Sequence, residues 1–292
     1  MKAYTLGLYE KAMPRVLTWQ EKLLIAKEVG FDFLEISVDE TDEKLARLEM
    51  TKPERLELLT LSREIGISID TMCLSGHRKY PLGSSDLRIC EKGMEIMEKA
   101  IDLAKDLSVR IIQLAGYDVY YEESNPETKK RFMGNLKKSV SLAAKAGVIL
   151  GFETMETDFM NTVEKAMKYV TLVDSPYLKV YPDIGNLTNA AITYKNDVLE
   201  DLILGRGNVV AMHLKETVPG IYREVPYGTG HVDFPTAISC AWNMGVRKFV
   251  TEFWDTGNPD WKDDLYFAYD IFTSLLEEKT HEADFLHSTI AF

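Results

Sequence analysis

Four residues that can bind a metal ion lie at the ends of short apolar runs, at nearly even spacing. They are Glu153, Asp183, His213 and Glu252, in the segments GVILGFE, LKVYPD, NVVAMH and RKFVTEF. The intervals are 30, 30 and 39 residues, each long enough for one strand and one helix. If the runs are parallel strands, the four side chains gather at one end of one sheet. Three carboxylates and an imidazole there could bind a divalent metal and leave a carboxylate on each side of a substrate carbon.

The types of the four candidate ligands restrict which metal ions can bind. Three carboxylates and one imidazole form an oxygen-rich set, which favours Mn²⁺, Mg²⁺ or Co²⁺, permits Zn²⁺ and disfavours thiolate-seeking ions. Cys73 ends another apolar run, and we interpret it as a small buried hydrophobic residue rather than as a fifth ligand. Any single member of the set could instead be an ion-pairing or capping residue at a strand end. Four of them in consecutive units favour a site.

The apolar runs belong to an alternation of short strands and amphipathic helices that extends through the chain. Eight candidate strands occupy residues 4–9, 33–37, 67–73, 109–116, 148–153, 178–183, 209–213 and 248–253. Eight helices alternate with them, and the mean repeat of about 36 residues is typical of βα units. The sequence therefore predicts an α/β fold, a single (β/α)8 TIM barrel. An open doubly wound sheet is the competing architecture, but GLYEKAMP after the first strand lacks a Gly-rich phosphate turn.

Helix start and stop signals support this pattern. Thr18 and Glu21 can form a capping box, and Gly30 can end the helix that they begin. Residues 86–107 predict a long amphipathic helix despite the internal Gly93. No linker or shift in composition interrupts the alternation of strands and helices.

We expect one domain, a (β/α)8 barrel over residues 1–280, and a C-terminal tail over residues 281–292.

Composition excludes several classes of protein. The net charge of −12 argues against a nucleic-acid partner, because phosphates repel an acidic surface. Cys73, Cys90 and Cys240 have no metal-type spacing, so we expect reduced thiols. The N-terminal MKAYTLGLYEK has no apolar signal segment, and no stretch of 18 apolar residues occurs. We therefore expect a cytoplasmic protein that does not bind or span a membrane.

The chain resembles the xylose-isomerase-like barrel superfamily, which contains sugar epimerases, sugar isomerases and abasic-site endonucleases. The segments that carry the resemblance are YPDIGN (181–186), AMHLKE (211–216), YGTGHVDF (227–234) and TEF (251–253). Three more are similar to the L-ribulose-5-phosphate (L-xylulose-5-phosphate) 3-epimerases and the hexulose-6-phosphate isomerase-type proteins: FDFLEISVDETDE (31–43), MCLSGHRKYPLGS (72–84) and IQLAGYDVYYEE (112–123).

This resemblance implies a metal-dependent enzyme, an isomerase of the carbohydrate epimerase class. The implied metal ligands are Glu153, Asp183, His213 and Glu252, and the implied catalytic acid/base pair is Glu153 and Glu252. The implied reaction interconverts L-ribulose 5-phosphate and L-xylulose 5-phosphate in pentose and ascorbate utilisation. One glutamate removes a proton from one face of the carbon, the other delivers a proton to the opposite face, and a divalent ion stabilises the enediolate between. A homo-oligomer, namely a dimer, is also expected.

Loops after the strands are expected to bind the substrate. The basic segment HRK after the third strand places His77 and Arg78 close to Ser75, and Ser37 at the end of the second strand could add a hydroxyl. Arg223 matches a position where related keto-sugar epimerases place an arginine on the substrate. For His77, a loop histidine without a role is the alternative.

Polar residues near the strand ends complete the expected site. Glu156 and Asn186 each lie three residues beyond a ligand position, where they suit hydrogen bonds to sugar hydroxyls or to ligand carboxylates. We interpret Glu35 as a partner for polar groups inside the barrel.

Four other functions share parts of this sequence pattern. An aldose–ketose isomerase of the hexulose-6-phosphate type and a free-keto-sugar 3-epimerase would use the same metal and bases, so the placement of the sugar decides between them. The endonuclease branch and several free-sugar epimerases carry a histidine where this chain has Asn186, which disfavours both. A DNA-repair endonuclease also needs further histidines and a basic groove, and the chain has only five histidines. A non-catalytic sugar-binding barrel would be expected to have lost a metal ligand.

Overall fold

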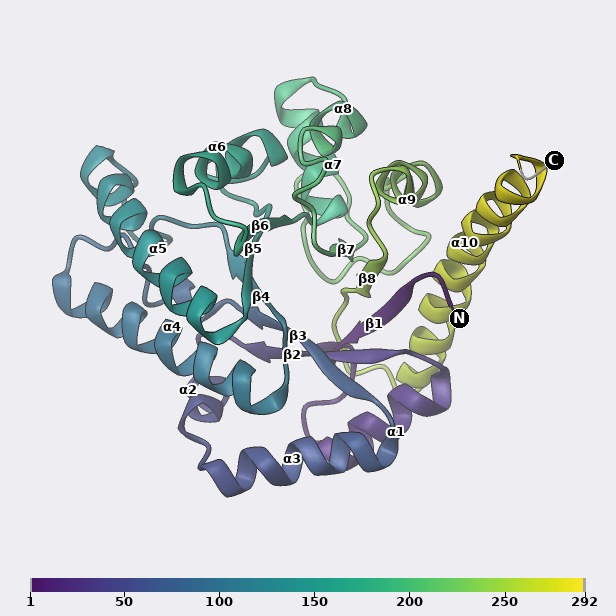
Figure 1. Cartoon of the computed structure of the whole chain (residues 1–292), viewed down its shortest axis with the longest axis horizontal. Helices are drawn as coiled ribbons and strands as arrows, with labels where there is room; N and C mark the ends of the chain where they lie inside the picture. Colours follow the sequence, from purple (N-terminus) through teal and green to yellow (C-terminus); the bar gives the residue numbers. More distant parts are fainter. Residues whose placement is uncertain (1, 291–292) are drawn as a thin grey trace.

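Eight parallel strands form one sheet that curls into a barrel, with helices around its outside (Figure 1). The structure, a computed structural model, describes residues 2–290. Neighbouring strands follow the order β6-β5-β4-β3-β2-β1-β8-β7. The strands are β1 (Thr5–Tyr9), β2 (Phe33–Val38), β3 (Ser68–Leu74), β4 (Ile111–Ala115), β5 (Ile149–Glu153), β6 (Leu178–Tyr181), β7 (Met212–Leu214) and β8 (Lys248–Thr251). The predicted TIM barrel is confirmed.

The barrel closes between β6 and β7 through isolated parallel bridges rather than a continuous ladder. Val180 pairs with Val209, and Asp183 pairs with His213. The backbone N–H of His213 donates to the carbonyl oxygen of Pro182 at 2.9 Å. The seam therefore aligns two of the four candidate ligands directly across from each other.

Within residues 2–290 the structure has ten α-helices, two more than the sequence pattern predicted. The additional ones are the short α2 (Asp42–Leu45) and α8 (Val198–Ile203). The others are α1 (Trp19–Val29), α3 (Lys52–Ile65), α4 (Leu87–Leu107), α5 (Pro126–Ala146), α6 (Val163–Val173), α7 (Ile184–Tyr194), α9 (Phe234–Asn243) and α10 (Trp261–Ile290); three short 3-10 helices are η1 (Glu10–Ala12), η2 (Ala46–Glu49) and η3 (Gly76–Arg78).

The helix signals in the sequence correspond to observed caps. Thr18 and Glu21 form the expected capping box, and Gly30 ends α1 in the left-handed region at φ 111°. Gly93 in the middle of α4 has a packing reason: a Cβ there would lie 2.4 Å from the carbonyl oxygen of Tyr80. The glycine allows the loop after β3 to lie directly on α4.

Several strand ends differ from the prediction by one or two residues, and the largest differences are at β7 and at the C-terminal helix. The regular part of β7 begins at Met212 instead of residue 209, because only isolated bridges join that segment to β6. The expected tail is not separate from the last helix, since α10 continues through residue 280 to Ile290. The domain boundary at 280 thus stays a prediction without a structural break, and residues 291 and 292 lie outside the described residues.

Apolar side chains fill two regions, one between sheet and helices and one inside the barrel. The inner cluster includes Phe33, Ile111, Tyr181 and Val250, all buried. Its residues alternate along the strands with those of the outer core, as period-two patterning requires. This packing leaves the carboxyl ends of the strands for polar groups.

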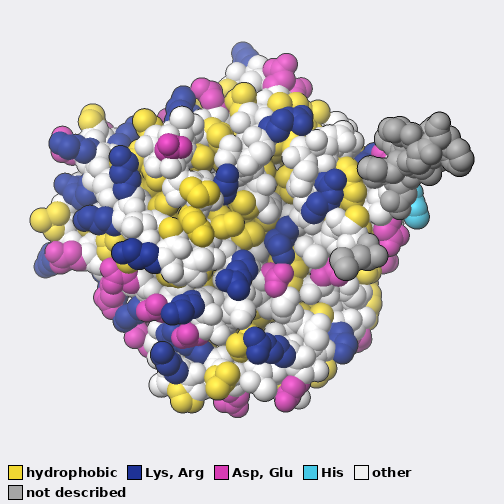
Figure 2. Space-filling view, viewed as in Figure 1, with side chains coloured by type: hydrophobic (Ala, Val, Ile, Leu, Met, Phe, Trp, Pro, Cys, Tyr) yellow, Lys and Arg dark blue, Asp and Glu magenta, His cyan; other side chains and the backbone are white. Residues whose placement is uncertain are grey.

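The outer surface carries mixed charge. On the face shown in Figure 2, Lys and Arg side chains are scattered among Asp and Glu side chains. No helix within the described residues is long and apolar enough to cross a membrane.

A buried ion cluster links the first two βα units. The carboxylate of Glu10 accepts hydrogen bonds from Lys22 at 3.1 Å, from Lys44 at 3.4 Å, from Arg47 and from the backbone N–H of Ser37 at 2.7 Å. Burial alone would raise the pKa of Glu10, but these cations outweigh it and lower the pKa to about 2. Since the cations come from α1, α2 and η2, one carboxylate holds three segments against β1.

We expect Glu10→Gln to lower the free energy of unfolding by about 3 kcal/mol, because it keeps the shape but leaves buried cations without their counter-charge. Urea unfolding followed by circular dichroism measures this. Glu164→Gln is the control, since it breaks an exposed pair with Lys168 at 3.0 Å and should have little effect. Equal losses in the two variants would contradict the role of Glu10.

Candidate functional site

The four predicted metal ligands meet at the carboxyl end of the barrel. Glu153 is the last residue of β5, His213 lies in β7, Glu252 follows β8, and Asp183 caps α7 two residues after β6. All four are buried, and one ligand atom from each lies within 4.8 Å of the others. The expected gathering is therefore confirmed.

His213 is oriented by a carboxylate behind it. Its Nε2 donates to Glu35 at 2.7 Å, and Glu35 also accepts hydrogen bonds from Thr71 at 2.7 Å and Tyr181 at 2.9 Å. This confirms the interpretation of Glu35 as a partner for barrel polar groups. The arrangement turns Nδ1 toward the carboxylates, 2.9 Å from Glu252 Oε2. A carboxylate that fixes an imidazole in this way is typical of metal-binding histidines.

The cluster has the unsatisfied polar atoms that a cation would need. Among the described residues, His213 Nδ1, Asp183 Oδ2 and Glu252 Oε2 are buried and make no well-formed hydrogen bond, although Asp183 Oδ2 forms an ion pair with Lys215 and His213 Nδ1 lies close to Glu252 Oε2. Leaving buried polar atoms unpaired costs free energy, and binding a divalent cation would remove that cost. The residues therefore fit a metal ion.

Burial and charge set different pKa values within the cluster. Burial and the charge of Glu252 raise the pKa of Glu153. Burial would also raise the pKa of Glu252, but Lys215 and His213 outweigh it and lower that pKa far below its usual range. Burial lowers the pKa of His213, but Glu35 and Glu252 outweigh this effect and raise it. The two glutamates thus differ in how readily each accepts a proton.

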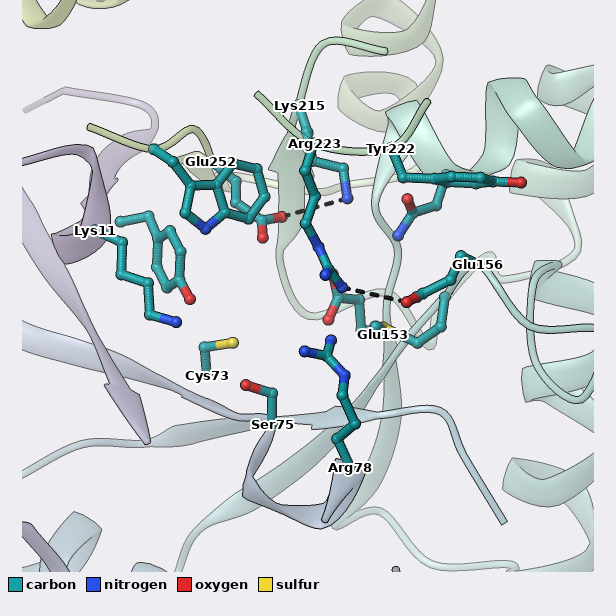
Figure 3. Close-up of a pocket in the computed structure, with 14 residues that line it drawn as sticks. Lys11, Cys73, Ser75, Arg78, Glu153, Glu156, Lys215, Tyr222, Arg223 and Glu252 are labelled. Atoms are coloured by element: carbon teal, nitrogen blue, oxygen red, sulfur yellow. Dashed lines mark hydrogen bonds and ion pairs between the residues drawn. The ribbon is translucent and has the colours of Figure 1, made fainter. Parts of the chain in front are cut away.

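A lysine accompanies the carboxylates. Lys215 Nζ lies 2.6 Å from Asp183 Oδ2 and 3.9 Å from Glu252 Oε2. Burial raises the pKa of Asp183 well above its usual range, and Lys215 offsets only part of that shift. Figure 3 shows the ammonium directed at Glu252.

A pocket opens above the cluster (Figure 3). Five of the predicted substrate-binding residues line it, namely Ser75, Arg78, Glu156, Asn186 and Arg223, together with Glu153 and Glu252. The remaining lining residues are Tyr9, Lys11, Cys73, Met155, Lys215, Tyr222 and Trp254. The sequence analysis had identified none of these as substrate contacts.

Two arginines face the pocket, and a hydrogen-bond network that includes Glu156 connects them. Arg223 Nη2 donates to Glu156 at 3.2 Å, and Tyr117 and Tyr120 also donate to that carboxylate, each at 3.2 Å. Arg78 donates to the hydroxyl of Tyr117 at 3.2 Å. Figure 3 shows both guanidinium groups pointing toward the centre of the pocket. The network holds two cations on one side of it.

Two predicted substrate-binding residues are placed elsewhere, which corrects those predictions. The described residues that line the pocket do not include Ser37 or His77. The hydroxyl of Ser37 is buried and accepts a hydrogen bond from Tyr9 at 3.3 Å. His77 is buried against α4, where its Nε2 lies 3.0 Å from the carbonyl oxygen of Gly93. The backbone of α4 therefore holds this histidine away from the pocket.

A period-two signal could have identified several of the missed residues. Along an extended chain, residues two apart point to the same side. The pocket contains such pairs: Cys73 and Ser75, Glu153 and Met155, Glu252 and Trp254; Lys215 likewise follows His213 by two. Cys73 is buried as expected, and it lines the pocket outside the four-residue cluster.

The buried position of His77 predicts a pH dependence of stability. Burial lowers its pKa to about 4, from about 6.5 in the unfolded chain. Between these values the unfolded state binds more protons, so the free energy of unfolding should fall as the pH falls from about 6.5 to about 4. The loss should reach about 3 kcal/mol.

Urea unfolding at a series of pH values measures this slope. His77→Gln should flatten it in that window, whereas His281→Gln, at an exposed position on α10, should keep the wild-type slope. An unchanged slope in His77→Gln would show that other groups cause it.

Residues 23–270 match the family described as the xylose isomerase-like TIM barrel. The chain is 46% identical over 254 residues to the L-ribulose-5-phosphate 3-epimerase UlaE of Escherichia coli O139:H28, an alignment that covers 87% of this chain and 88% of the relative. A relative of the same name from Salmonella heidelberg is 45% identical, with the same coverage.

Solved structures show the same fold. A D-tagatose 3-epimerase-like protein superposes with a TM-score of 0.79 at 17% identity, covering 96% of this chain and 99% of that one. An L-ribulose 3-epimerase superposes with a TM-score of 0.76 at 17% identity, covering 97% and 98%.

Proposed function

We propose that this chain, which belongs to the xylose isomerase-like TIM barrel family, is a metal-dependent 3-epimerase of L-ribulose 5-phosphate and L-xylulose 5-phosphate. The observation that carries the proposal is the meeting of Glu153 and Glu252 in one buried cluster below a basic pocket. The relatives of 46% identity support the choice of sugar phosphate.

Glu153, Asp183, His213 and Glu252 would hold the metal ion. A divalent cation bound there supplies positive charge next to the sugar oxygens beside the reacting carbon. Mn²⁺, Mg²⁺, Co²⁺ and Zn²⁺ all suit this donor set. The expected homodimer and cytoplasmic location also stay predictions.

The two glutamates supply the acid and the base. An epimerisation at C3 removes a proton from one face of the carbon and returns one to the other, so a single group on one side is not sufficient. In the metal-free protein the pKa of Glu153 is raised and that of Glu252 is lowered, so the two carboxylates are not equivalent. In the reverse direction the two residues exchange roles.

The pocket suits a phosphorylated sugar. Arg78, Arg223 and Lys11 line it in a protein whose net charge is −12. Arginine forks match phosphate oxygens, and Ser75 adds a hydroxyl donor. The phosphate binding energy can orient the reacting carbon above the two glutamates.

The direct test is conversion of L-ribulose 5-phosphate to L-xylulose 5-phosphate, followed by NMR in D₂O. We expect turnover with Mn²⁺, loss of activity in EDTA and recovery when the metal is restored. Unphosphorylated L-ribulose should lose turnover as well as affinity, because the remote dianion is missing.

The alternatives give different products. An aldose product would indicate an aldose–ketose isomerase, and equal kcat/KM for L-ribulose and its 5-phosphate would indicate a free-sugar epimerase. Full activity in the metal-free protein would contradict the metal requirement.

Glu153→Gln and Glu252→Gln should each abolish net epimerisation, with a loss of about 10² to 10⁴-fold from the missing proton-transfer group. A variant that keeps its metal should still exchange the C3 proton of one epimer with D₂O, and the two variants should differ in which epimer they exchange.

Metal content has to be measured alongside, since each residue is also a candidate ligand. If both variants retain metal and exchange the same epimer at equal rates, the assignment of two bases is wrong.

A further inference from the structure

Lys215 is a buried cation that the proposed mechanism does not use. It follows β7 directly, and only 5% of its side chain is exposed. Its Nζ lies 2.6 Å from Asp183 Oδ2 and 3.9 Å from Glu252 Oε2. It also lines the substrate pocket. The ammonium is therefore in contact with the cluster and next to the space that the sugar would occupy.

Burying an ammonium costs several kcal/mol unless its partners compensate. Here the partners are two of the carboxylates that a metal ion would bind. The Lys215 ammonium and a divalent cation would thus compete for the same carboxylates. A lysine that served only stability could pair with a carboxylate elsewhere, as Lys248 does with Asp70 at 2.7 Å.

Lys215 changes the net charge of the candidate metal site. Glu153, Asp183 and Glu252 carry three negative charges when ionised, and a divalent ion offsets two of them. The lysine offsets the third. Removal of a proton from the sugar adds negative charge to the same small volume, and nearby negative charge opposes that step.

We propose that Lys215 is a charge-balancing and positioning residue of this centre. Its fixed positive charge relieves repulsion between Asp183 and Glu252 in the metal-free protein. The same charge weakens the binding of a divalent cation. It also reduces the negative charge near the substrate, which makes removal of the substrate proton easier. The effect on proton removal rests on the proposed function, whereas the effects on carboxylate repulsion and on metal binding do not.

The test compares wild type with Lys215→Met, which keeps the length but removes the charge, and Lys215→Arg, which keeps the charge. The probe is Mn²⁺ alone, titrated into EDTA-treated protein. Lys215→Met should bind Mn²⁺ at least about tenfold more tightly, because a competing cation is gone. Its metal-free form should unfold at a lower temperature, and Lys215→Arg should lie closer to wild type in both measurements.

Lys248→Met is the matched control, since it removes a paired lysine at the opposite end of β8. It should leave Mn²⁺ affinity unchanged. If Lys215→Met does not fold without metal, it can be purified with Mn²⁺ and its affinity measured by competition with a chelator. Mn²⁺ affinity that is unchanged or weaker would overturn the proposal, because a purely structural lysine predicts that result.

Substrate exchange separates this inference from the proposed function. In an active wild type, C3–H exchange of L-ribulose 5-phosphate should slow by about 10²-fold in Lys215→Met at saturating Mn²⁺. If Lys215→Met exchanges the C3 proton as fast as wild type, the proposed effect of Lys215 on proton removal is wrong. If wild type does not act on this sugar at all, the proposed function fails, and the Mn²⁺ titration still decides the role of Lys215.

Discussion

Repulsion between buried carboxylates at one end of the barrel is the constraint on which the other features of the site depend. Glu153, Asp183 and Glu252 lose their water there, and burial raises the pKa of the first two. Two neighbouring side chains offset this charge or supply a donor: Lys215 faces Asp183, and Gln113 donates to Glu153. Ligand atoms of Glu153, Asp183, His213 and Glu252 lie within 4.8 Å of one another, so a divalent cation among them would offset much of the remaining negative charge.

The parallel barrel is suited to holding such a cluster. It brings the carboxyl ends of all strands together, so side chains far apart in sequence meet without long loops. Asp183 has two functions in this arrangement, because one of its oxygens accepts from the N–H of Asn186 at 2.8 Å and begins α7. The other oxygen remains directed at Lys215 and the cluster. The same carboxylate therefore stabilises a helix and contributes to the candidate metal centre.

The pocket is lined by both acidic and basic side chains. Carboxylates lie at its base, and Arg78, Arg223 and Lys11 line it with them (Figure 3). Glu156 offsets part of the repulsion between the two arginines, since it accepts from Arg223 and, through Tyr117, connects to Arg78. A substrate with a phosphate at one end and a metal-binding keto-sugar group at the other suits both kinds of side chain.

Sequence periodicity by itself determined the barrel, most of its helix caps and the four residues of the cluster, because each depends on local spacing or on strand ends that the fold must align. Tertiary structure decided what local spacing does not encode. His77 belongs to a basic loop segment, yet the carbonyl of Gly93 holds it away from the pocket. Ser37 is at a strand end, yet it lies beneath Tyr9. Lys215 and Lys11 line the pocket, and the sequence analysis did not identify either of them. The direction of a loop side chain depends on contacts with distant segments, and those contacts exist only once the barrel has closed.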